Sequence, residues 1–559
     1  MYNHFMLSKE LIKAREYETE AGALIGDDER PLYHFTARKG WLNDPNGFSF
    51  FGGKYHLFYQ YHPYSTYWGP MHWGHAVSED LLNWEYLPCA LAPDKEYDAA
   101  GCFSGSAITL PDGRQLLMYT GCNAEDIDED GRWAQTQCLA VSEGPASDAS
   151  GPEGETEYIK YDNNPVITDA DLPPGGDKYE FRDPYIWQAG DGSYRAVVAN
   201  ANRDGSKATQ LSMFRSDDAF SWQFDKVLFE DRRKIGIMWE CPNFFPLRDE
   251  SLPDPPADND ESRQVASYVL IASPMDMELE DADGSIRFPK GNNVCYMVGE
   301  YDETSEEFVP RESESHEKRA NGAAGTGIAL AAYHPVDCGL DFYAPQVMHA
   351  PDGRCIMIGW MQDPSTANLH PDEYKFFGQM SVPRELTLRG GRLIQTPVRE
   401  VESLRSGHPV FASIELEKSE RSMEGISGRM MDMEIEIKPN SVSPAGICSL
   451  EEFTMRFARD YEHYVELSYR PDSSVLSIDR GQSGQAEDIT SKRSIRVRDR
   501  NGCINMRILL DRYSAEIFIN GGEQVMSVTY HTTLDADGIT FSAEGESHMD
   551  ISAYKLGTF

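Results

Sequence analysis

The sequence predicts an all-β protein, in which a five-bladed β-propeller is followed by a C-terminal β-sandwich. Two observations predict this class: a strand-turn-strand unit recurs five times before residue 361, and alternating strands without that unit fill the remainder. The length agrees, because a chain of 559 residues exceeds the size at which one hydrophobic core normally keeps growing.

Each unit begins with a short polar or aromatic cluster, runs through apolar residues to a turn, and enters a second apolar strand. In four units a turn glycine lies nine positions after Asp44, Ser104, Asp183 or Ala344, which predicts two strands joined by a hairpin. Further strand-like segments separate the units, so four-stranded blades around a common axis are expected. The five clusters are Asn43 to Gly47, Phe103 to Ser106, Arg182 to Pro184, Glu240 to Pro242 and Asp341 to Ala344.

Beyond about Leu404 the strands alternate without the cluster, as in MRILLDRYSAEIFI before the turn at Asn520, and they indicate a separate sandwich. Helix-forming sequence is concentrated in the opening SKELIKAREYETEAG. We therefore expect an N-terminal helical extension at 1–30, a propeller at 31–397, a linker at 398–408 and a sandwich at 409–559.

The formal net charge of -41 creates an acidic field that repels phosphate backbones and anionic lipid head groups. Nucleic acid and membrane surfaces are therefore not expected as partners, whereas a neutral sugar is indifferent to this field. The ten cysteines are scattered singly, and neither a secretory h-region nor a long apolar span is present. These features indicate a reducing, cytoplasmic location.

No metal and no cofactor is expected. The segment MHWGHA contains His72 and His75 but no cysteine or carboxylate that could complete a metal site, so we interpret both histidines as structural residues. The sequence also contains no phosphate-binding loop and no dinucleotide fingerprint between a strand and a helix.

If the first strand of each blade is the innermost, the five clusters converge at one end of a central channel. Three of them carry an acid, Asp44, Asp183 and Glu240. For a single cluster, a simple strand-entry turn explains the acid and proline equally well, but three acids at one structural phase favour a site.

Two facing carboxylates can cleave a glycosidic bond, one as proton donor and one as nucleophile, and Asp44 and Glu240 suit these roles. Arg182 is expected to keep Asp183 charged, so that it accepts hydrogen bonds from sugar hydroxyls.

The neighbours along the chain suggest different protonation states for the two reacting acids. Asn43 and the turn amides are expected to hold Asp44 ionised. Glu240 lies between Trp239 and Cys241, whose apolar character is expected to favour the protonated acid.

Aromatic residues crowd the same neighbourhoods and offer flat faces for sugar rings, although most aromatics in propeller blades serve packing. Trp68 is the strongest binding candidate, because it lies in a polar loop after a strand that leaves the channel. The aromatic residues in these segments are Trp41, Tyr59, Tyr61, Tyr67, Trp68, Trp73, Phe103 and Trp239.

The three acidic motifs, in this order, resemble those of glycoside hydrolase family 32, the invertases and fructan hydrolases. They are WLNDPNG at Trp41 to Gly47, FRDP at Phe181 to Pro184 and WECP at Trp239 to Pro242. The resemblance extends through FYQYHP, WGHA, FSGSA, DFYAPQ, GQMSVPREL and IFINGGE, and so covers nearly the whole chain beyond the first thirty residues.

This resemblance implies a retaining β-fructofuranosidase that cleaves sucrose or short fructo-oligosaccharides through a covalent fructosyl intermediate. Asp44 would be the nucleophile, Glu240 the acid/base and Asp183 the transition-state stabiliser. The WGPMHWGHA run is similar to the bacterial intracellular branch. The residues that match the fructose-binding shell of the family are Asn43, Gln60, Trp68, Phe103, Ser104 and Arg182.

Two positions depart from the family pattern: His62 stands where Asn is familiar, and Asn243 where an acid is common. Three alternatives stay open: an inverting pentosidase on a related five-bladed fold, a sugar-binding protein without turnover, and a transfructosylating enzyme. The sequence leaves the preferred substrate undetermined among sucrose, sucrose 6-phosphate, kestose, inulin and levan. It also leaves open the oligomeric state and the role of the sandwich.

Overall fold

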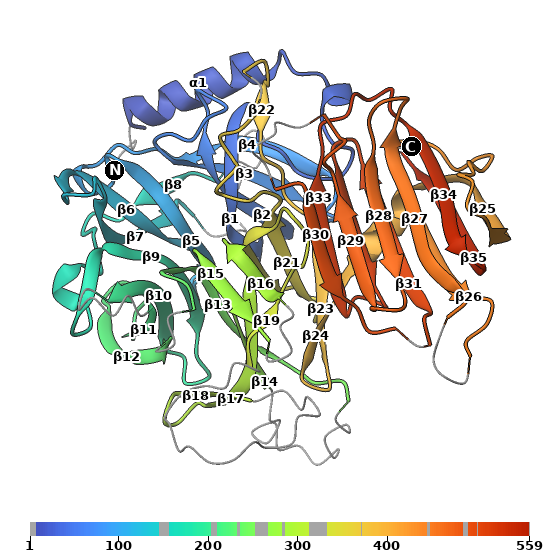
Figure 1. The fold of residues 1–559 in the computed structure, drawn as a ribbon. Coiled ribbons are helices and arrows are strands. Elements are labelled where there is room, and N and C mark those ends of the chain that lie inside the picture. Colours follow the sequence, from blue (N-terminus) through green and yellow to red (C-terminus); the bar gives the residue numbers. More distant parts are fainter. Residues whose placement is uncertain are drawn as a thin grey trace, which may run out of the picture.

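The computed structural model describes residues 7–144, 156–202, 209–231, 235–251, 267–281, 286–311, 332–370, 372–443, 448–484, 490–499 and 501–557. Within these ranges the protein is nearly all β, as predicted (Figure 1). The one α-helix among the described residues, α1 (Lys9–Gly22), lies in the segment for which a helix was expected, and the Ser8 side chain caps its N-terminus. Short 3₁₀ helices are η1 (Asp27–Glu29), η2 (Glu96–Asp98), η4 (Asp169–Asp171) and η7 (Arg399–Leu404).

The first three sheets are each built from four consecutive antiparallel strands, and β22 (Phe376–Phe377) adds a parallel strand beside β1. The first sheet contains β1 (Gly40–Phe51), β2 (Lys54–His62), β3 (His72–Ser78) and β4 (Trp84–Leu91). The second contains β5 (Gly101–Thr109), β6 (Gln115–Ile127), β7 (Trp133–Ser142) and β8 (Tyr158–Lys160). The third contains β9 (Gly176–Gln188), β10 (Tyr194–Asn202), β11 (Thr209–Ser216) and β12 (Gln223–Glu230).

The fourth and fifth sheets repeat this plan with longer connections. The fourth is β13 (Trp239–Leu247), β14 (Ser267–Pro274), β17 (Cys295–Asp302) and β18 (Glu307–Pro310), with β19 (His334–Pro335) also paired to β17. A separate ribbon, β15 (Met277–Glu280) and β16 (Ile286–Gly291), is inserted within it. The fifth is β20 (Tyr343–His349), β21 (Cys355–Trp360), β23 (Arg384–Arg389) and β24 (Arg392–Pro397).

The four turn glycines of the repeat lie in the hairpins that the nine-residue spacing predicts. Gly53, Gly113, Gly192 and Gly353 have φ of +85°, +84°, +85° and +86°, a left-handed conformation that favours glycine. Each lies between the first and second strand of its sheet, so the predicted hairpins are confirmed.

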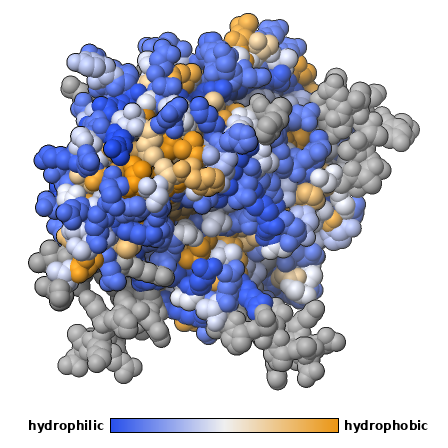
Figure 2. Space-filling view, turned by 90° about the vertical axis from the view of Figure 1, so that its right-hand side faces the viewer, coloured by the Kyte–Doolittle hydropathy of each residue, from blue (hydrophilic) through white to orange (hydrophobic). Residues whose placement is uncertain are grey.

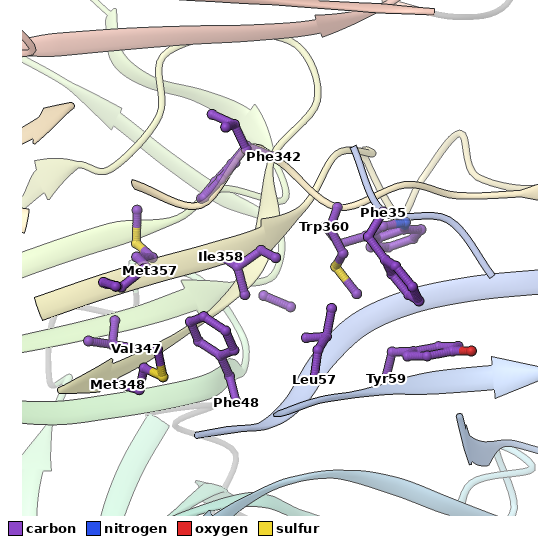
Figure 3. Close-up of a cluster of buried hydrophobic side chains, with 14 of the residues drawn as sticks. Phe35, Phe48, Leu57, Tyr59, Phe342, Val347, Met348, Met357, Ile358 and Trp360 are labelled. Atoms are coloured by element: carbon purple, nitrogen blue, oxygen red, sulfur yellow. The ribbon is translucent and has the colours of Figure 1, made fainter. Parts of the chain in front are cut away.

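The first strands of the five sheets pack against one another at the centre of this part of the molecule. β1 contacts β5 and β20, β5 contacts β9, β9 contacts β13, and β13 contacts β20. Figure 3 shows one such junction, where Phe48 and Leu57 of the first sheet meet Val347, Met357 and Ile358 of the fifth. The clusters carried by these strands therefore face a shared centre.

Every first strand also loses its regular register at the polar cluster. The irregularities fall at Leu42/Pro45 in β1, Phe103/Gly105 in β5, Arg182/Tyr185 in β9, Glu240/Asn243 in β13 and Tyr343/Gln346 in β20. A β-bulge re-aims the side chains on its strand. In three strands the bulge contains a left-handed residue other than glycine, with φ of 65° at Asp183, 48° at Cys241 and 47° at Ala344.

After η7, two antiparallel sheets take up the rest of the chain. Their apolar faces share a core to which Met433, Ile435, Phe453, Leu467 and Ile508 belong. One sheet has the order β25-β35-β26-β31-β32-β33, and the other β30-β29-β28-β27-β34. Figure 2 looks onto the side where these sheets lie; it is mostly hydrophilic, with apolar residues gathered beside a hollow near its centre. The strands are β25 (Arg405–Leu416), β26 (Met431–Pro439), β27 (Leu450–Arg459), β28 (Val465–Arg470), β29 (Val475–Asp479), β30 (Lys492–Arg496), β31 (Ile504–Asp511), β32 (Ser514–Ile519), β33 (Gln524–Thr529), β34 (Gly538–Gly545) and β35 (Ser547–Leu556).

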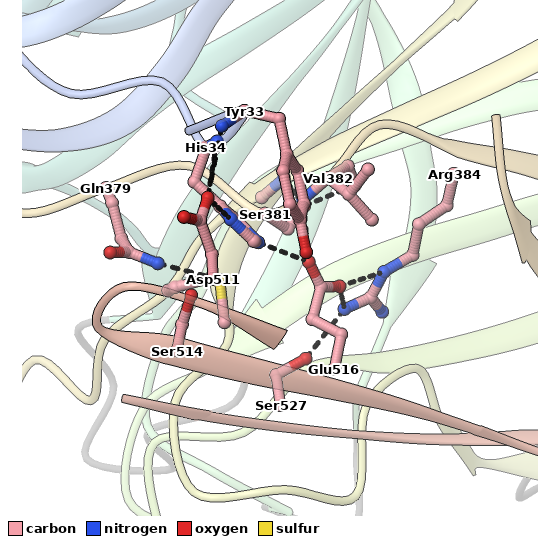
Figure 4. Close-up of polar contacts among 12 residues, drawn as sticks. Tyr33, His34, Gln379, Ser381, Val382, Arg384, Asp511, Ser514, Glu516 and Ser527 are labelled. Atoms are coloured by element: carbon pink, nitrogen blue, oxygen red, sulfur yellow. Dashed lines mark hydrogen bonds and ion pairs between the residues drawn. The ribbon is translucent and has the colours of Figure 1, made fainter. Parts of the chain in front are cut away.

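A buried charge network ties the C-terminal sheets to the rest of the chain (Figure 4). The two ring nitrogens of His34 lie 2.8 Å from Oδ2 of Asp511 and 2.9 Å from Oε1 of Glu516. Arg384 of β23 donates to the other Glu516 oxygen, Oε2, at 2.6 Å and to Ser527 at 2.7 Å. Burial opposes the charge on His34, but the two carboxylates outweigh it and raise its pKa to about 9.

Candidate active site

A cavity of about 460 Å³ opens where the bulged first strands converge. Its walls also include side chains from the second and third strands of neighbouring sheets. All nine site residues predicted from the sequence line it: Asn43, Asp44, Gln60, Trp68, Phe103, Ser104, Arg182, Asp183 and Glu240.

Asp44 is held by donors from two other strands as well as its own. Its Oδ2 accepts 2.6 Å from the Ser104 hydroxyl and 3.5 Å from the Cys241 thiol, and its Oδ1 accepts 3.0 Å from the Asn43 amide. Burial raises the pKa of Asp44 above its ordinary value, the Ser104 hydrogen bond opposes this rise, and the charge of Glu240 adds to it. The expected Asn43 contact is present and favours the ionised form, although burial sets the overall direction of the pKa shift.

Asp183 is the most enclosed of the three acids, with 5% of its surface exposed. Its backbone N–H donates 3.0 Å to the Thr120 hydroxyl, and its Oδ2 accepts 3.0 Å from the backbone N–H of Cys241. Burial raises its pKa to about 7; Arg182 opposes the shift, whereas Glu240 and Asp44 add to it. Arg182 favours the charged form of Asp183, as expected, but burial and the two neighbouring carboxylates outweigh it in the direction of the pKa shift.

Glu240 lies in polar surroundings rather than the apolar ones expected. The Nε and Nη2 atoms of Arg182 lie 3.0 and 2.9 Å from its Oε1, and the Tyr343 hydroxyl donates 2.7 Å to its Oε2. Trp239 packs away from it, against Phe229 and Tyr333. Neighbours along a strand point to opposite faces, so Trp239 does not shield the carboxyl.

Cys241 lies next to all three acids and contacts two of them directly. Its backbone N–H binds Asp183, its thiol contacts both Asp44 and Asp183, and Glu240 precedes it in the chain. The left-handed φ of 48° at Cys241 allows this geometry at the bulge.

Aromatic residues form the mouth of the cavity. Trp68 is 42% exposed, and its ring lies parallel to that of Trp133, with centroids 6.1 Å apart and an interplanar angle of 15°. Phe103 presents its ring edgewise to both, at 6.1 Å from Trp68 and 6.3 Å from Trp133. This arrangement leaves flat apolar surfaces where a sugar could stack.

Gln60 and Asn43 line the cavity and are held in place by hydrogen bonds to neighbouring groups. The Gln60 amide donates 2.8 Å to Asn46 and 3.0 Å to the carbonyl of Cys102. The Asn43 carbonyl accepts 2.7 Å from the Trp41 indole, which orients its amide toward Asp44.

Sequence reasoning missed several lining residues. Tyr343 belongs to a cluster that the repeat identified, so its place in the fifth unit was an available signal. Arg132 and Trp133 come from the β6–β7 hairpin, and nothing in their local sequence indicates that this hairpin reaches the cavity. The other lining residues not singled out include Gln135, Tyr179, Glu180, Met275, Trp360 and Asn368.

The histidines interpreted as structural are buried. His75 Nε2 lies 3.0 Å from His56 Nδ1, and the His75 ring stacks on Phe58. No group of three or more His, Cys, Asp or Glu side chains that could hold a metal occurs among the residues that the structure describes. Likewise, in the described ranges no helix is both long and apolar enough to cross a membrane.

Comparisons with known proteins identify the family of the chain. The family model for the glycosyl hydrolases family 32 N-terminal domain matches residues 34–397, and that for the family 32 C terminal matches residues 400–555. A sucrose-6-phosphate hydrolase of Zymomonas mobilis is 30% identical, with 97% of this chain and 95% of the relative covered. A raffinose invertase of Escherichia coli is also 30% identical, with 97% and 98% covered.

Among solved structures, a mutant family 32 β-fructofuranosidase of Bombyx mori in complex with sucrose has a TM-score of 0.74 and 27% identity. The match covers 99% of each chain. The fold, the site and these relatives together define a glycoside hydrolase. The chain belongs to glycoside hydrolase family 32.

Proposed function

We propose that this protein hydrolyses terminal β-D-fructofuranosides, such as sucrose and short fructo-oligosaccharides, and releases fructose. The observation that carries the proposal is the convergence of Asp44, Asp183 and Glu240 around Cys241 in one cavity. The relatives support the substrate class, since they include a raffinose invertase and a β-fructofuranosidase with bound sucrose.

The proposed mechanism is a double displacement with retained configuration. Asp44, as the carboxylate, attacks the anomeric carbon while Glu240 gives its proton to the departing glycosidic oxygen. The resulting fructosyl ester is then cleaved by water, from which Glu240 takes a proton, and both acids return to their starting states.

The surrounding residues have supporting roles in this proposal. Ser104 and Asn43 orient Asp44 through the 2.6 and 3.0 Å hydrogen bonds to its two oxygens. Arg182 and Tyr343 fix the Glu240 carboxyl through its two oxygens. Asp183 accepts hydrogen bonds from fructose hydroxyls and stabilises the transition state. Gln60, Trp68 and Phe103 complete the fructose-binding shell.

We also propose the finer fold assignment and the domain boundaries. The five sheets are the blades of a propeller at 31–397, preceded by a helical extension at 1–30; the pairwise contacts of β1, β5, β9, β13 and β20 support this. A linker at 398–408 leads to a β-sandwich at 409–559, which is supported by the shared core of the two C-terminal sheets.

We propose a cytoplasmic location. All ten cysteines are free, and seven of them are buried. This agrees with a compartment that keeps thiols reduced.

The test is fructose release from sucrose, 1-kestose, inulin, levan and sucrose 6-phosphate by the wild type and by Asp44→Asn. Asp191→Asn, in the exposed β9–β10 turn, is the matched control. If the wild type and Asp191→Asn release fructose and Asp44→Asn does not, the result supports the proposal, and the rates rank the substrates. If the wild type acts on none of the five, the pentosidase or the sugar-binding alternative replaces it.

A further inference from the structure

The leaving-group side of the cavity is built from an acidic hairpin. Asp183 is almost fully buried at the floor, whereas Trp68 is 42% exposed at the mouth. The sugar that leaves must therefore lie toward the mouth, where Gly131, Arg132 and Trp133 of the β6–β7 hairpin line the wall. The acids of this hairpin are Glu125, Asp126, Asp128, Glu129 and Asp130.

Arg132 is the cation of the hairpin that lines this wall, and carboxylates already surround it. Its Nη2 lies 2.6 Å from Asp128 and 3.7 Å from Asp130, and its Nη1 lies 3.1 Å from Glu180 and 3.8 Å from Asp177. Oδ2 of Asp128 also accepts 2.8 Å from the Arg132 Nε, so two guanidinium nitrogens share this one oxygen.

Arg182, the second cation lining the cavity, is occupied in the same way. It binds Glu240 at 2.9 Å, contacts Glu180 and lies 4.0 Å from Asp183. Among the described residues that line the cavity there are no further cations, while the acids Asp44, Glu180, Asp183 and Glu240 all face it. Lys178, near the hairpin, is bound to Asp126.

A phosphate monoester carries a charge of about −1.5 to −2 at neutral pH. A phosphate on the leaving sugar would meet Glu180, which lines the cavity. It would also have to compete with Asp128 and Glu180 for the Arg132 guanidinium. Like charges brought together in this way disfavour binding.

We infer that this site accepts neutral fructosides and discriminates against fructosides phosphorylated on the leaving sugar, because carboxylates of the β6–β7 hairpin occupy Arg132. The inference rests on the proposed function. It distinguishes this chain from several of its relatives, which are sucrose-6-phosphate hydrolases.

The first test compares kcat/KM for sucrose and sucrose 6-phosphate. We expect the phosphorylated sugar to be worse by roughly tenfold or more, and the gap to narrow with added salt, which screens the repulsion. Equal values, or a preference for sucrose 6-phosphate, would overturn the inference while leaving fructoside hydrolysis intact.

A binding measurement keeps this test independent of turnover. Calorimetric titration of Asp44→Asn with each sugar should give tighter binding of sucrose than of sucrose 6-phosphate. Failure of the wild type to release fructose would refute the proposed function only, whereas equal or tighter binding of the phosphorylated sugar would refute the present inference.

A charge-removal variant tests the role of the hairpin itself. In Asp128→Asn the amide oxygen can still accept the 2.8 Å hydrogen bond from the backbone N–H of Arg132, but the negative charge that pairs with the guanidinium is gone. We expect kcat/KM for sucrose 6-phosphate to rise several-fold while that for sucrose stays unchanged. Asp130→Asn, at a residue that contacts Arg132 only at 3.7 Å, should give a smaller change in the same direction.

The matched control is Asp112→Asn. Asp112 makes the same kind of contact with Arg114, but in the β5–β6 turn at the opposite end of the sheet. It should leave both substrates unaffected. If Asp128→Asn changes both sugars equally, or if Asp112→Asn reproduces its effect, the hairpin does not set the discrimination.

Discussion

The Ser104 hydroxyl donates a 2.6 Å hydrogen bond to Oδ2 of Asp44, across the junction between the first and second sheets. Ser104 is buried, so this bond is shielded from water and favours the ionised form of Asp44. Burial already raises the pKa of Asp44, and the Ser104 bond is the largest contribution that opposes the rise. The proposed nucleophile therefore depends on a neighbour sixty residues away in the chain.

Ser104→Ala should move the acid limb of the kcat/KM profile to higher pH. Loss of the donor raises the pKa of Asp44 further, so a larger fraction is protonated and inactive at a given acidic pH. We expect kcat/KM at pH 5 to fall roughly tenfold to a hundredfold, with a smaller loss at pH 8. Ser106→Ala is the control, since its hydroxyl binds the Pro184 carbonyl rather than Asp44. An unshifted acid limb in Ser104→Ala would contradict this role.

Glu240→Gln should affect substrates according to their leaving groups. An amide cannot donate the proton that a poor leaving group such as glucose requires, so sucrose hydrolysis should fall by about 10² to 10⁴-fold. An activated aryl fructoside should lose much less, because its leaving group departs without protonation. Steady-state kinetics on both substrates measure the difference; equal losses would argue against Glu240 as the acid.

Asp183→Asn should stabilise the fold while removing activity. The pKa of Asp183 is raised to about 7 in the folded protein, above its unfolded value, so the folded state binds this proton more tightly. Ionisation therefore costs stability as pH rises from about 4 to about 7, and the loss persists above that range.

The variant cannot ionise, so we expect its Tm to exceed that of wild type by roughly 2 °C or more at pH 8 and to differ little at pH 4. Calorimetry at the two pH values measures this. A variant less stable than wild type at pH 8 would show that the charge of Asp183 is favourable in the free enzyme.

His34→Gln tests the buried network that joins the two parts of the chain. His34 binds Asp511 and Glu516 at once, and its folded pKa is about 9, above the unfolded value of about 6.5. The stability from this proton is fully present below about pH 6.5 and is lost as pH rises through about 9.

Removing one partner of a buried ion pair costs about 3 to 5 kcal/mol, so His34→Gln should unfold at a lower Tm near pH 6. The difference from wild type should shrink above pH 9. His548→Gln is the control, because that imidazole pairs with Glu415 and Asp550 on the exposed surface of β35. A pH-independent loss in His34→Gln would mean that shape alone, and not charge, is what His34 supplies.

The repeat made the convergence of the site predictable from sequence. The clusters that carry Asp44, Ser104, Asp183, Glu240 and Tyr343 recur at one phase, and in the structure each lies at a bulge in the first strand of its sheet. A periodic pattern places residues on a common edge without any knowledge of their contacts. The hairpin glycines were predictable for the same reason, because their left-handed φ restricts the residue type.

The electrostatics were not predictable, because they depend on contacts between sheets. Trp239 precedes Glu240 in sequence but points to the opposite face, whereas Arg182, fifty-eight residues away, lies 2.9 Å from its carboxyl. Likewise, the approach of Arg132 and Trp133 to the cavity depends on how the sheets pack together, which no local sequence pattern indicates. Sequence adjacency therefore misjudged which groups surround Glu240.

The stereochemistry of the first-formed fructose tests the central proposal most directly. Sucrose labelled with ¹³C at the anomeric carbon of fructose can be followed by NMR before the released sugar mutarotates. Retention through an Asp44 ester predicts that β-fructofuranose accumulates first and that Asp44→Asn releases none. First appearance of the α-anomer, or undiminished release by Asp44→Asn, would contradict the mechanism.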